Sequence, residues 1–100
     1  MIKIDKKIFE LRAGERIDIL EVKKKEEVVY YSYNYKIQKD GEWILYIRWD
    51  NFQNQPHVDK YDENGNHIET TSSREKNLKQ VIEVVDIFGR NLISMDLSRV

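Results

Sequence analysis

The sequence predicts an α+β fold, in which an antiparallel β-sheet of about five or six strands carries one long C-terminal helix packed across one face. Two strand pairs and one change of periodicity predict this class. Apolar and polar side chains alternate through residues 28–37 and 43–50, on either side of a turn at 39–41. A second, shorter pair is formed by residues 57–61 and 66–68. Further along the chain, apolar residues recur instead at the spacing of a helix.

Composition limits the classes of function. One hundred residues suffice for one domain, residues 1–100. Seventeen basic and 18 acidic residues give a net charge of −1, so no strong field attracts nucleic acids or membranes in general. The absence of cysteine excludes disulfides and thiolate metal sites. No stretch resembles a signal peptide or a membrane span, so we expect a cytoplasmic protein without a membrane partner. The single proline and the many Lys, Glu and Ile residues are typical of heat-adapted proteins.

The N-terminal region predicts a further pair of strands. Apolar residues recur imperfectly from Ile2 to Phe9, and residues 13–15 have the composition of a turn. In the strand that follows, Ile17 and Ile19, with Glu21, fall on one side.

The central hairpin allows two registers. A two-residue turn at Asp40-Gly41 would scatter the apolar residues over both faces, whereas a three-residue loop gathers them on one. The predicted cross-strand pairs are therefore Ile37–Trp43, Tyr35–Leu45, Tyr33–Ile47 and Tyr31–Trp49. The opposite face then carries Ser32, Asn34, Lys36, Tyr46, Arg48 and Asp50.

The second hairpin is predicted by the same reasoning. A three-residue loop within residues 62–66 pairs Tyr61 with His67 and Lys60 with Ile68. One face then carries His57, Asp59, Tyr61, His67 and Glu69.

A capping box at Ser72 and Glu75 predicts where the helix begins. We expect the helix to continue to about Ile93. Its apolar stripe consists of Leu78, Val81, Ile82, Val85, Phe88 and Leu92.

Two histidines and their neighbours form the best candidate for a site. A histidine held by a carboxylate can act as a general acid or base near neutral pH, and a tyrosine hydroxyl beside it can donate a proton. Arg48 would stabilise a phosphate or a developing negative charge if its strand lies next to the second hairpin. Such a set is typical of metal-independent RNA cleavage. The same residues are also typical of a solvent-facing sheet surface without any activity. The candidates are His57, Asp59, Tyr61 and His67.

Two other types of site are compatible with the sequence. The side chains of His57, Asp59 and His67 could bind a divalent metal, but their spacing matches no established motif and no fourth ligand is evident. We therefore predict no metal and no cofactor. Exposed rings at Tyr30, Tyr46 and Tyr61 could stack on the bases of a single-stranded nucleic acid.

Four short motifs resemble the TumE-like proteins, small toxins of bacterial and archaeal toxin–antitoxin pairs. The motifs lie within about residues 28–90 and are Tyr31-x-Tyr33-x-Tyr35, Arg48-Trp49-Asp50-Asn51, Pro56-His57 and Tyr61-Asp62-Glu63-Asn64-Gly65. The resemblance implies roles for Arg48, Asp50, His57 and Asp59, together with an antitoxin as partner. The chain departs from the pattern in having only His57 after Pro56, where the family is richer in histidine.

Two functions follow as hypotheses. The first is a toxin-like protein acting on RNA, with His57 as acid or base, Arg48 as charge stabiliser, and Asp50 and Asp59 orienting them. It requires His57 and Arg48 on one face, with functional atoms roughly 6–8 Å apart. The alternative is a non-catalytic module that binds a protein or single-stranded nucleic acid through the polar face, or forms a homodimer through a sheet edge.

Overall fold

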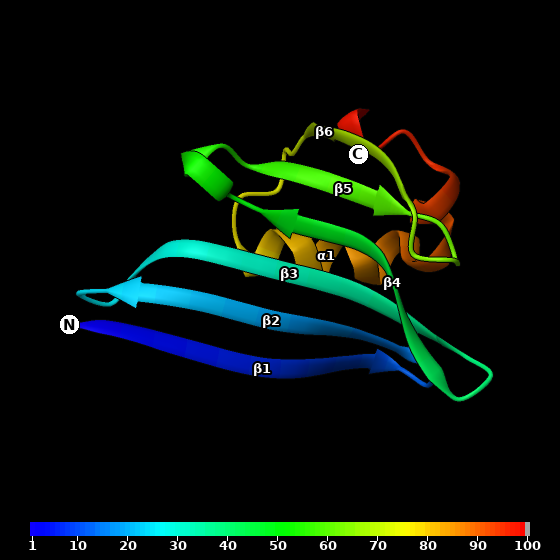
Figure 1. Ribbon diagram of the computed structural model, residues 1–100, viewed down its shortest axis with the longest axis horizontal. Helices are drawn as coiled ribbons and strands as arrows, with labels where there is room; N and C mark the ends of the chain where they lie inside the picture. Colours follow the sequence, from blue (N-terminus) through cyan, green and yellow to red (C-terminus); the bar gives the residue numbers. More distant parts are fainter. Residues whose placement is uncertain (100) are drawn as a thin grey trace.

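The computed structural model describes residues 1–99 and shows an antiparallel sheet of six strands followed by one α-helix (Figure 1). Each strand pairs with its neighbours in sequence, in the order β1-β2-β3-β4-β5-β6. The strands are β1 (Ile2–Arg12), β2 (Glu15–Lys24), β3 (Glu27–Lys39), β4 (Glu42–Asp50), β5 (His57–Tyr61) and β6 (His67–Ser72). The other elements are α1 (Leu78–Phe88) and three 3-10 helices, η1 (Phe52–Asn54), η2 (Gly89–Ser94) and η3 (Leu97–Arg99). The α+β class is confirmed. No helix in the described residues is long and apolar enough to cross a membrane.

The sheet has a buried face, called the core face, and an opposite face, called the outer face. Ile17, Ile19 and Glu21 are buried on the core face, as their alternation predicted. Figure 1 shows α1 behind β3 to β5, with β1 at the free border of the sheet. From the sheet, the core cluster contains Ile17, Ile19, Tyr31, Tyr33, Tyr35, Ile37, Ile47, Trp49 and Val58, and from the C-terminal segment Val81, Val85, Leu92 and Leu97.

The rings of the core face are anchored by buried carboxylates. The hydroxyl of Tyr33 donates to Glu21 over 2.6 Å. The indole Nε1 of Trp49 donates to Glu75 over 3.2 Å, and both residues are almost fully buried. Because a buried carboxylate without a donor is costly, these hydrogen bonds tie the position of each ring to a partner on another segment.

The buried Glu75 makes stability depend on pH. Burial raises the pKa of Glu75, and the hydrogen bond from Trp49 opposes this. A carboxyl whose pKa is raised on folding stabilises the protein in acid, and this contribution is lost as pH rises through the folded pKa. Glu75→Gln keeps an oxygen for the indole and has no charge. We therefore expect urea unfolding to show the variant gaining stability relative to wild type between pH 4 and pH 8. An equal difference at both pH values would contradict the role of Glu75.

The predicted register of the central hairpin is wrong along its length, because none of the four predicted cross-strand pairs forms. The turn has two residues, Asp40 and Gly41, with φ of 52° and 82°, so both are left-handed as in a type I′ turn. Ile37 therefore pairs with Ile44. As a consequence, Trp43 and Leu45 lie on the outer face, where the prediction placed them in the core.

A β-bulge at Tyr46 restores the predicted sides. Lys36 pairs with Leu45 and Tyr35 with Ile47, so one extra residue stands on β4. Beyond the bulge, Trp49 is on the core face as predicted, although its partner is Tyr33. Because of the bulge, the end of β4 farther from the turn presents its predicted site residues, Arg48 and Asp50, on the predicted face.

The second hairpin also contains a bulge. Tyr61 pairs with His67 as predicted, but Lys60 pairs with Glu69 because Ile68 is the extra residue. The prediction of a Lys60–Ile68 pair is therefore wrong. Glu69 lies on the side of Lys60 and forms an ion pair of 3.1 Å with it, so Glu69 is not on the face predicted for it.

The helix is shorter than predicted at both ends. Ser72 is the last residue of β6, and the N-cap is Asn77, whose side chain accepts from the backbone N–H of Gln80 over 2.9 Å. At the other end, Gly89 adopts a φ of 52° and the α-helix stops at Phe88. The expected continuation to Ile93 is the 3-10 helix η2 instead.

Candidate functional site

Strand pairing on the outer face brings the predicted residues together. Asp50 of β4 is directly opposite His57 of β5, and Arg48 is opposite Asp59 one step along. Because residues two apart on a strand point to the same side, these two pairs are neighbours on one face. The pair of Tyr61 on β5 and His67 on β6 lies next along this face and completes the set. The outer-face cluster consists of Arg48, Asp50, His57, Asp59, Tyr61 and His67.

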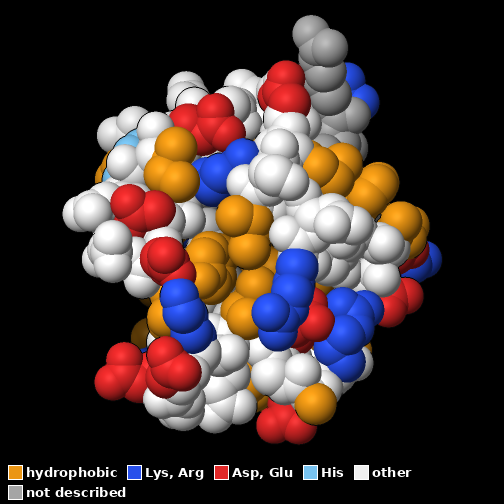
Figure 2. Space-filling view, turned by 90° about the vertical axis from the view of Figure 1, so that its right-hand side faces the viewer, with side chains coloured by type: hydrophobic (Ala, Val, Ile, Leu, Met, Phe, Trp, Pro, Cys, Tyr) orange, Lys and Arg blue, Asp and Glu red, His pale blue; other side chains and the backbone are white. Residues whose placement is uncertain are grey.

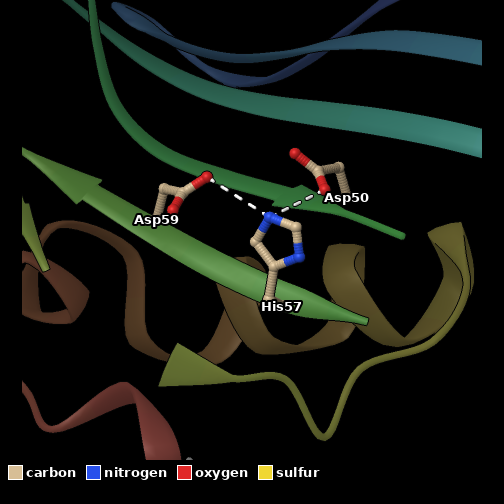
Figure 3. A group of neighbouring side chains, drawn as sticks. All are labelled: Asp50, His57 and Asp59. Atoms are coloured by element: carbon tan, nitrogen blue, oxygen red, sulfur yellow. Dashed lines mark ion pairs between the residues drawn. The ribbon is translucent and has the colours of Figure 1, made fainter. Parts of the chain in front are cut away.

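His57 is held in one orientation by both of its ring nitrogens. Nδ1 lies 3.0 Å from the backbone oxygen of Gln55, and since a carbonyl only accepts, Nδ1 carries a proton. Nε2 points between two carboxylates, 2.9 Å from Oδ1 of Asp50 and 3.6 Å from Oδ2 of Asp59 (Figure 3). Nε2 is therefore the ring atom that exchanges a proton, and Asp50 accepts from it when it is protonated.

The carboxylate of Asp50 is itself fixed. It is 7% exposed as a residue, and its Oδ1 accepts from the backbone N–H of Phe52 over 3.1 Å. The loop that follows β4 is tied to β3, because the side chain of Asn51 accepts from the N–H of Tyr31 over 2.8 Å. This explains why an Asp-Asn pair ends β4: each side chain satisfies the backbone as the chain leaves the sheet.

Asp59 is held from the β6 side. The hydroxyl of Thr70, its cross-strand partner, donates to Oδ1 of Asp59. Nε2 of His67 lies 3.3 Å from the same oxygen and 2.7 Å from the Thr70 hydroxyl. His67 therefore helps to hold the carboxylate of Asp59 in position. It has no place equivalent to that of His57, whose Nε2 lies between two carboxylates.

Arg48 supplies positive charge beside these carboxylates. Its Nε donates to the side chain of Asn34 on β3 over 2.7 Å, and its guanidinium lies 5.8 Å from the ring centre of Tyr61. Within the described part of the chain no carboxylate lies in ion-pair range of Arg48. Burial raises the pKa of the Tyr61 hydroxyl, and Arg48 opposes that shift, so Tyr61 is protonated at neutral pH. The charge of Arg48 and the proton of Tyr61 are thus both available to a ligand.

The cluster contains a candidate metal-binding trio, although no metal was predicted, and it differs from the set with which the sequence is compatible. Asp50, His57 and Asp59 each place a donor atom within 4.8 Å of the others. The contact from Nδ1 of His57 to a backbone carbonyl is the arrangement that fixes metal-bound histidines. Asp50 takes the place of His67, which lies 3.3 Å from Oδ1 of Asp59, whereas His57 lies 3.6 Å from Oδ2. The trio can hold a divalent cation or, equally, the proton shared by His57 and Asp50.

Two of the tyrosines predicted to bind, Tyr30 and Tyr46, are not members of the cluster. Tyr30 is half-buried on the outer face opposite Val22, two residues before Ser32, the cross-strand partner of Asp50. Tyr46 is the bulged residue and packs against the core cluster. Beside His57 there is instead a pocket of about 330 Å³, lined by Gln55, Pro56, His57, Thr70, Thr71 and Ser72.

Comparison with known proteins yields one family. Residues 4–86 match the family described as Domain of unknown function (DUF7718). The chain belongs to the DUF7718 family. No curated protein and no solved structure matches it. The outer-face cluster lies entirely within the matched residues, so it is part of the DUF7718 domain.

On the face of the DUF7718 chain that Figure 2 shows, charge is mixed rather than polarised. At the end of the molecule that carries the β3–β4 turn, Figure 2 shows basic and acidic side chains interspersed around hydrophobic ones. This agrees with the net charge of −1. An anionic ligand must therefore be recognised locally, by groups such as Arg48, rather than by a broad field.

Proposed function

We propose that this DUF7718 chain is a small toxin-like protein of a toxin–antitoxin module that acts on RNA through the outer-face cluster. The observation that carries the proposal is the placement of His57 and Arg48 in adjacent cross-strand pairs on one face. In this proposal the helix lies across the core face only, so the outer face stays open to RNA. The partner is an antitoxin that covers the cluster.

The cluster supports cleavage by the ribose 2′-hydroxyl. Nε2 of His57 takes the 2′-proton, and Asp50 stabilises the imidazolium that results. The 2′-oxygen bonds to phosphorus, and the bond from phosphorus to the 5′-oxygen breaks. Tyr61 gives its proton to the leaving 5′-oxygen. Water then reprotonates Tyr61, and the His57 imidazolium gives its proton to the hydroxide that this leaves, so both groups return to their starting states. Arg48 stabilises the negative charge that builds on the phosphoryl oxygens.

The test is cleavage of a single-stranded RNA by the purified protein in EDTA, compared with the same sequence lacking 2′-hydroxyls. We expect a 2′,3′-cyclic phosphate from the RNA and no cleavage of the deoxy strand. We expect Zn²⁺ to inhibit, because a metal on Asp50, His57 and Asp59 would occupy Nε2. Inert RNA, or cleavage of the deoxy strand, would contradict the proposal. Cleavage that stops in EDTA and returns with metal would assign the trio to a metal instead.

A further inference from the structure

β1 is a long strand at a free edge of the sheet. It has 11 residues, and β2 is its only neighbour in the sheet formed by the described residues. The opposite edge, β6, has six residues and is interrupted by the bulge at Ile68. β1 pairs with β2 without interruption from Ile2 to Glu10, and its register shift lies near its end, between Glu10 and Arg12. Short, bulged edges resist pairing with another chain, whereas long regular stretches invite it. Figure 1 shows β1 running along the border of the sheet, away from α1.

β1 exposes large apolar side chains to solvent. Ile4 and Ile8 are 62% and 60% exposed, and both lie on the outer face. On β2, Val22 is opposite Ile4 and Leu20 is opposite Lys6, whereas Asp18 is opposite Ile8. On the other side of the strand, Asp5 and Lys7 alternate in charge.

We propose that two copies of this chain pair antiparallel through β1, about a two-fold axis at Lys6. A continuous sheet keeps each face on its own side only if odd positions oppose odd ones and even positions oppose even ones. Centred on Lys6, the pairing sets Ile4 opposite the partner subunit's Ile8. It also sets Asp5 opposite the partner subunit's Lys7. By symmetry each contact occurs twice.

The neighbouring registers are worse matched. Centred on Asp5, the pairing would bring two Asp5 carboxylates together and put Lys3 opposite the partner subunit's Lys7. Centred on Lys7, it would oppose two Lys7 ammonium groups and put Asp5 opposite the partner subunit's Phe9. Like charges directly opposite each other are destabilising. At the Lys6 axis one such pair remains, on long side chains that can diverge into solvent.

The proposal does not depend on the RNA activity. The two-fold axis stands perpendicular to the sheet, so both outer-face clusters would face the same side of a twelve-stranded sheet. Asp5 already forms ion pairs with Lys23 at 3.2 Å and Lys3 at 3.8 Å, so its carboxylate is held in place beside the edge.

The test uses two charge reversals, Asp5→Lys and Lys7→Asp, and light scattering coupled to size exclusion. Wild type should be a dimer. Each variant alone opposes like charges twice, which should raise the dimer Kd about tenfold or more. When the two variants are mixed, positions 5 and 7 of one subunit carry the opposite charge to positions 7 and 5 of the other, so a heterodimer should form. Lys79→Asp, on the exposed side of α1, is the matched control and should remain dimeric.

Each other outcome overturns the proposal. A monomeric wild type would exclude the dimer. This holds also if β1 pairs with a different protein instead. Variants that stay dimeric place the interface elsewhere. If the two variants are folded by circular dichroism and remain monomeric when mixed, the register is wrong.

Discussion

His57→Ala is expected to lower the rate of RNA cleavage by about 10²–10⁴-fold, the usual contribution of a positioned acid or base. The reason is geometric. Nε2 of His57 is the ring atom free to exchange a proton, and the contact from Nδ1 to the carbonyl of Gln55 keeps it pointed at Asp50. Alanine removes the proton acceptor and leaves the neighbouring carboxylates in place. The measurement is the single-turnover rate on a labelled single-stranded RNA.

A second histidine provides the control for this experiment. His67 lies on the same face and is 49% exposed at its side chain, but its polar contacts are with Asp59 and Thr70, and its ring packs edge-on against Tyr61 with the ring centres 5.5 Å apart. His67→Ala should therefore change the rate by less than about tenfold, since His67 acts only indirectly, through the positions of Asp59 and Tyr61. Equal losses in the two variants would mean that neither histidine exchanges the proton. An unchanged rate in His57→Ala would remove the proposed mechanism outright.

Two substitutions of Arg48 test, in the same assay, whether its charge or its hydrogen bond matters for the rate of cleavage. Arg48→Ala removes the positive charge, whereas lysine keeps it and loses the guanidinium contact with Asn34. If Arg48 stabilises charge on the phosphoryl group, lysine should restore part of the rate that alanine loses. Thermal unfolding of each variant checks that a lost rate is not a lost fold.

Most of the site could be predicted because its members are local in sequence. His57, Asp59 and Tyr61 share a face through simple alternation, and a short hairpin brings His67 to Tyr61. The neighbouring position of Arg48 depended on the order of the strands, which alternation does not specify. The pairing of β4 with β5 supplies it.

The supporting residues could not be predicted from their type. Asn34, Gln55 and Thr70 are ordinary polar residues of strands and loops. Gln55 acts through its backbone oxygen, so its side chain carries no signal at all. Asn34 belongs to the alternating stretch of β3, but its contact with Arg48 follows only from the register of β3 and β4.

The errors in strand register arise at two extra residues. Binary patterning favours one continuous apolar face, and an unbroken ladder can provide that face only with a three-residue loop in the central hairpin. The bulge at Tyr46 removes this conflict: the two-residue turn forms, and the far end of the strand still faces the core. A similar extra residue, Ile68, moves Glu69 to the side of Lys60. Neither bulge contains a glycine that would mark it in the sequence.

The observed register places the two tryptophans of β4 on opposite faces of the sheet. We therefore expect their removal to lower stability by very different amounts. Trp49 is 1% exposed and donates to the buried Glu75, so Trp49→Ala should lower the free energy of unfolding by about 3–5 kcal/mol. Trp43 lies on the outer face under the guanidinium of Arg16, at 4.3 Å from the ring centre. Trp43→Ala should cost only about 1 kcal/mol, the size of a cation–π contact at a partly exposed site.

Urea unfolding followed by circular dichroism compares the two variants with wild type, since each removes one of the two tryptophans that fluorescence would report. Trp49→Phe adds a finer test: it keeps an aromatic ring in the core and removes the donor to Glu75, so its loss should lie between the other two. Equal losses of stability at positions 43 and 49 would indicate that Trp43 lies in the core and that the central hairpin has the uninterrupted register predicted from the sequence. A small loss at Trp49 would instead mean that the core face is not packed around this ring.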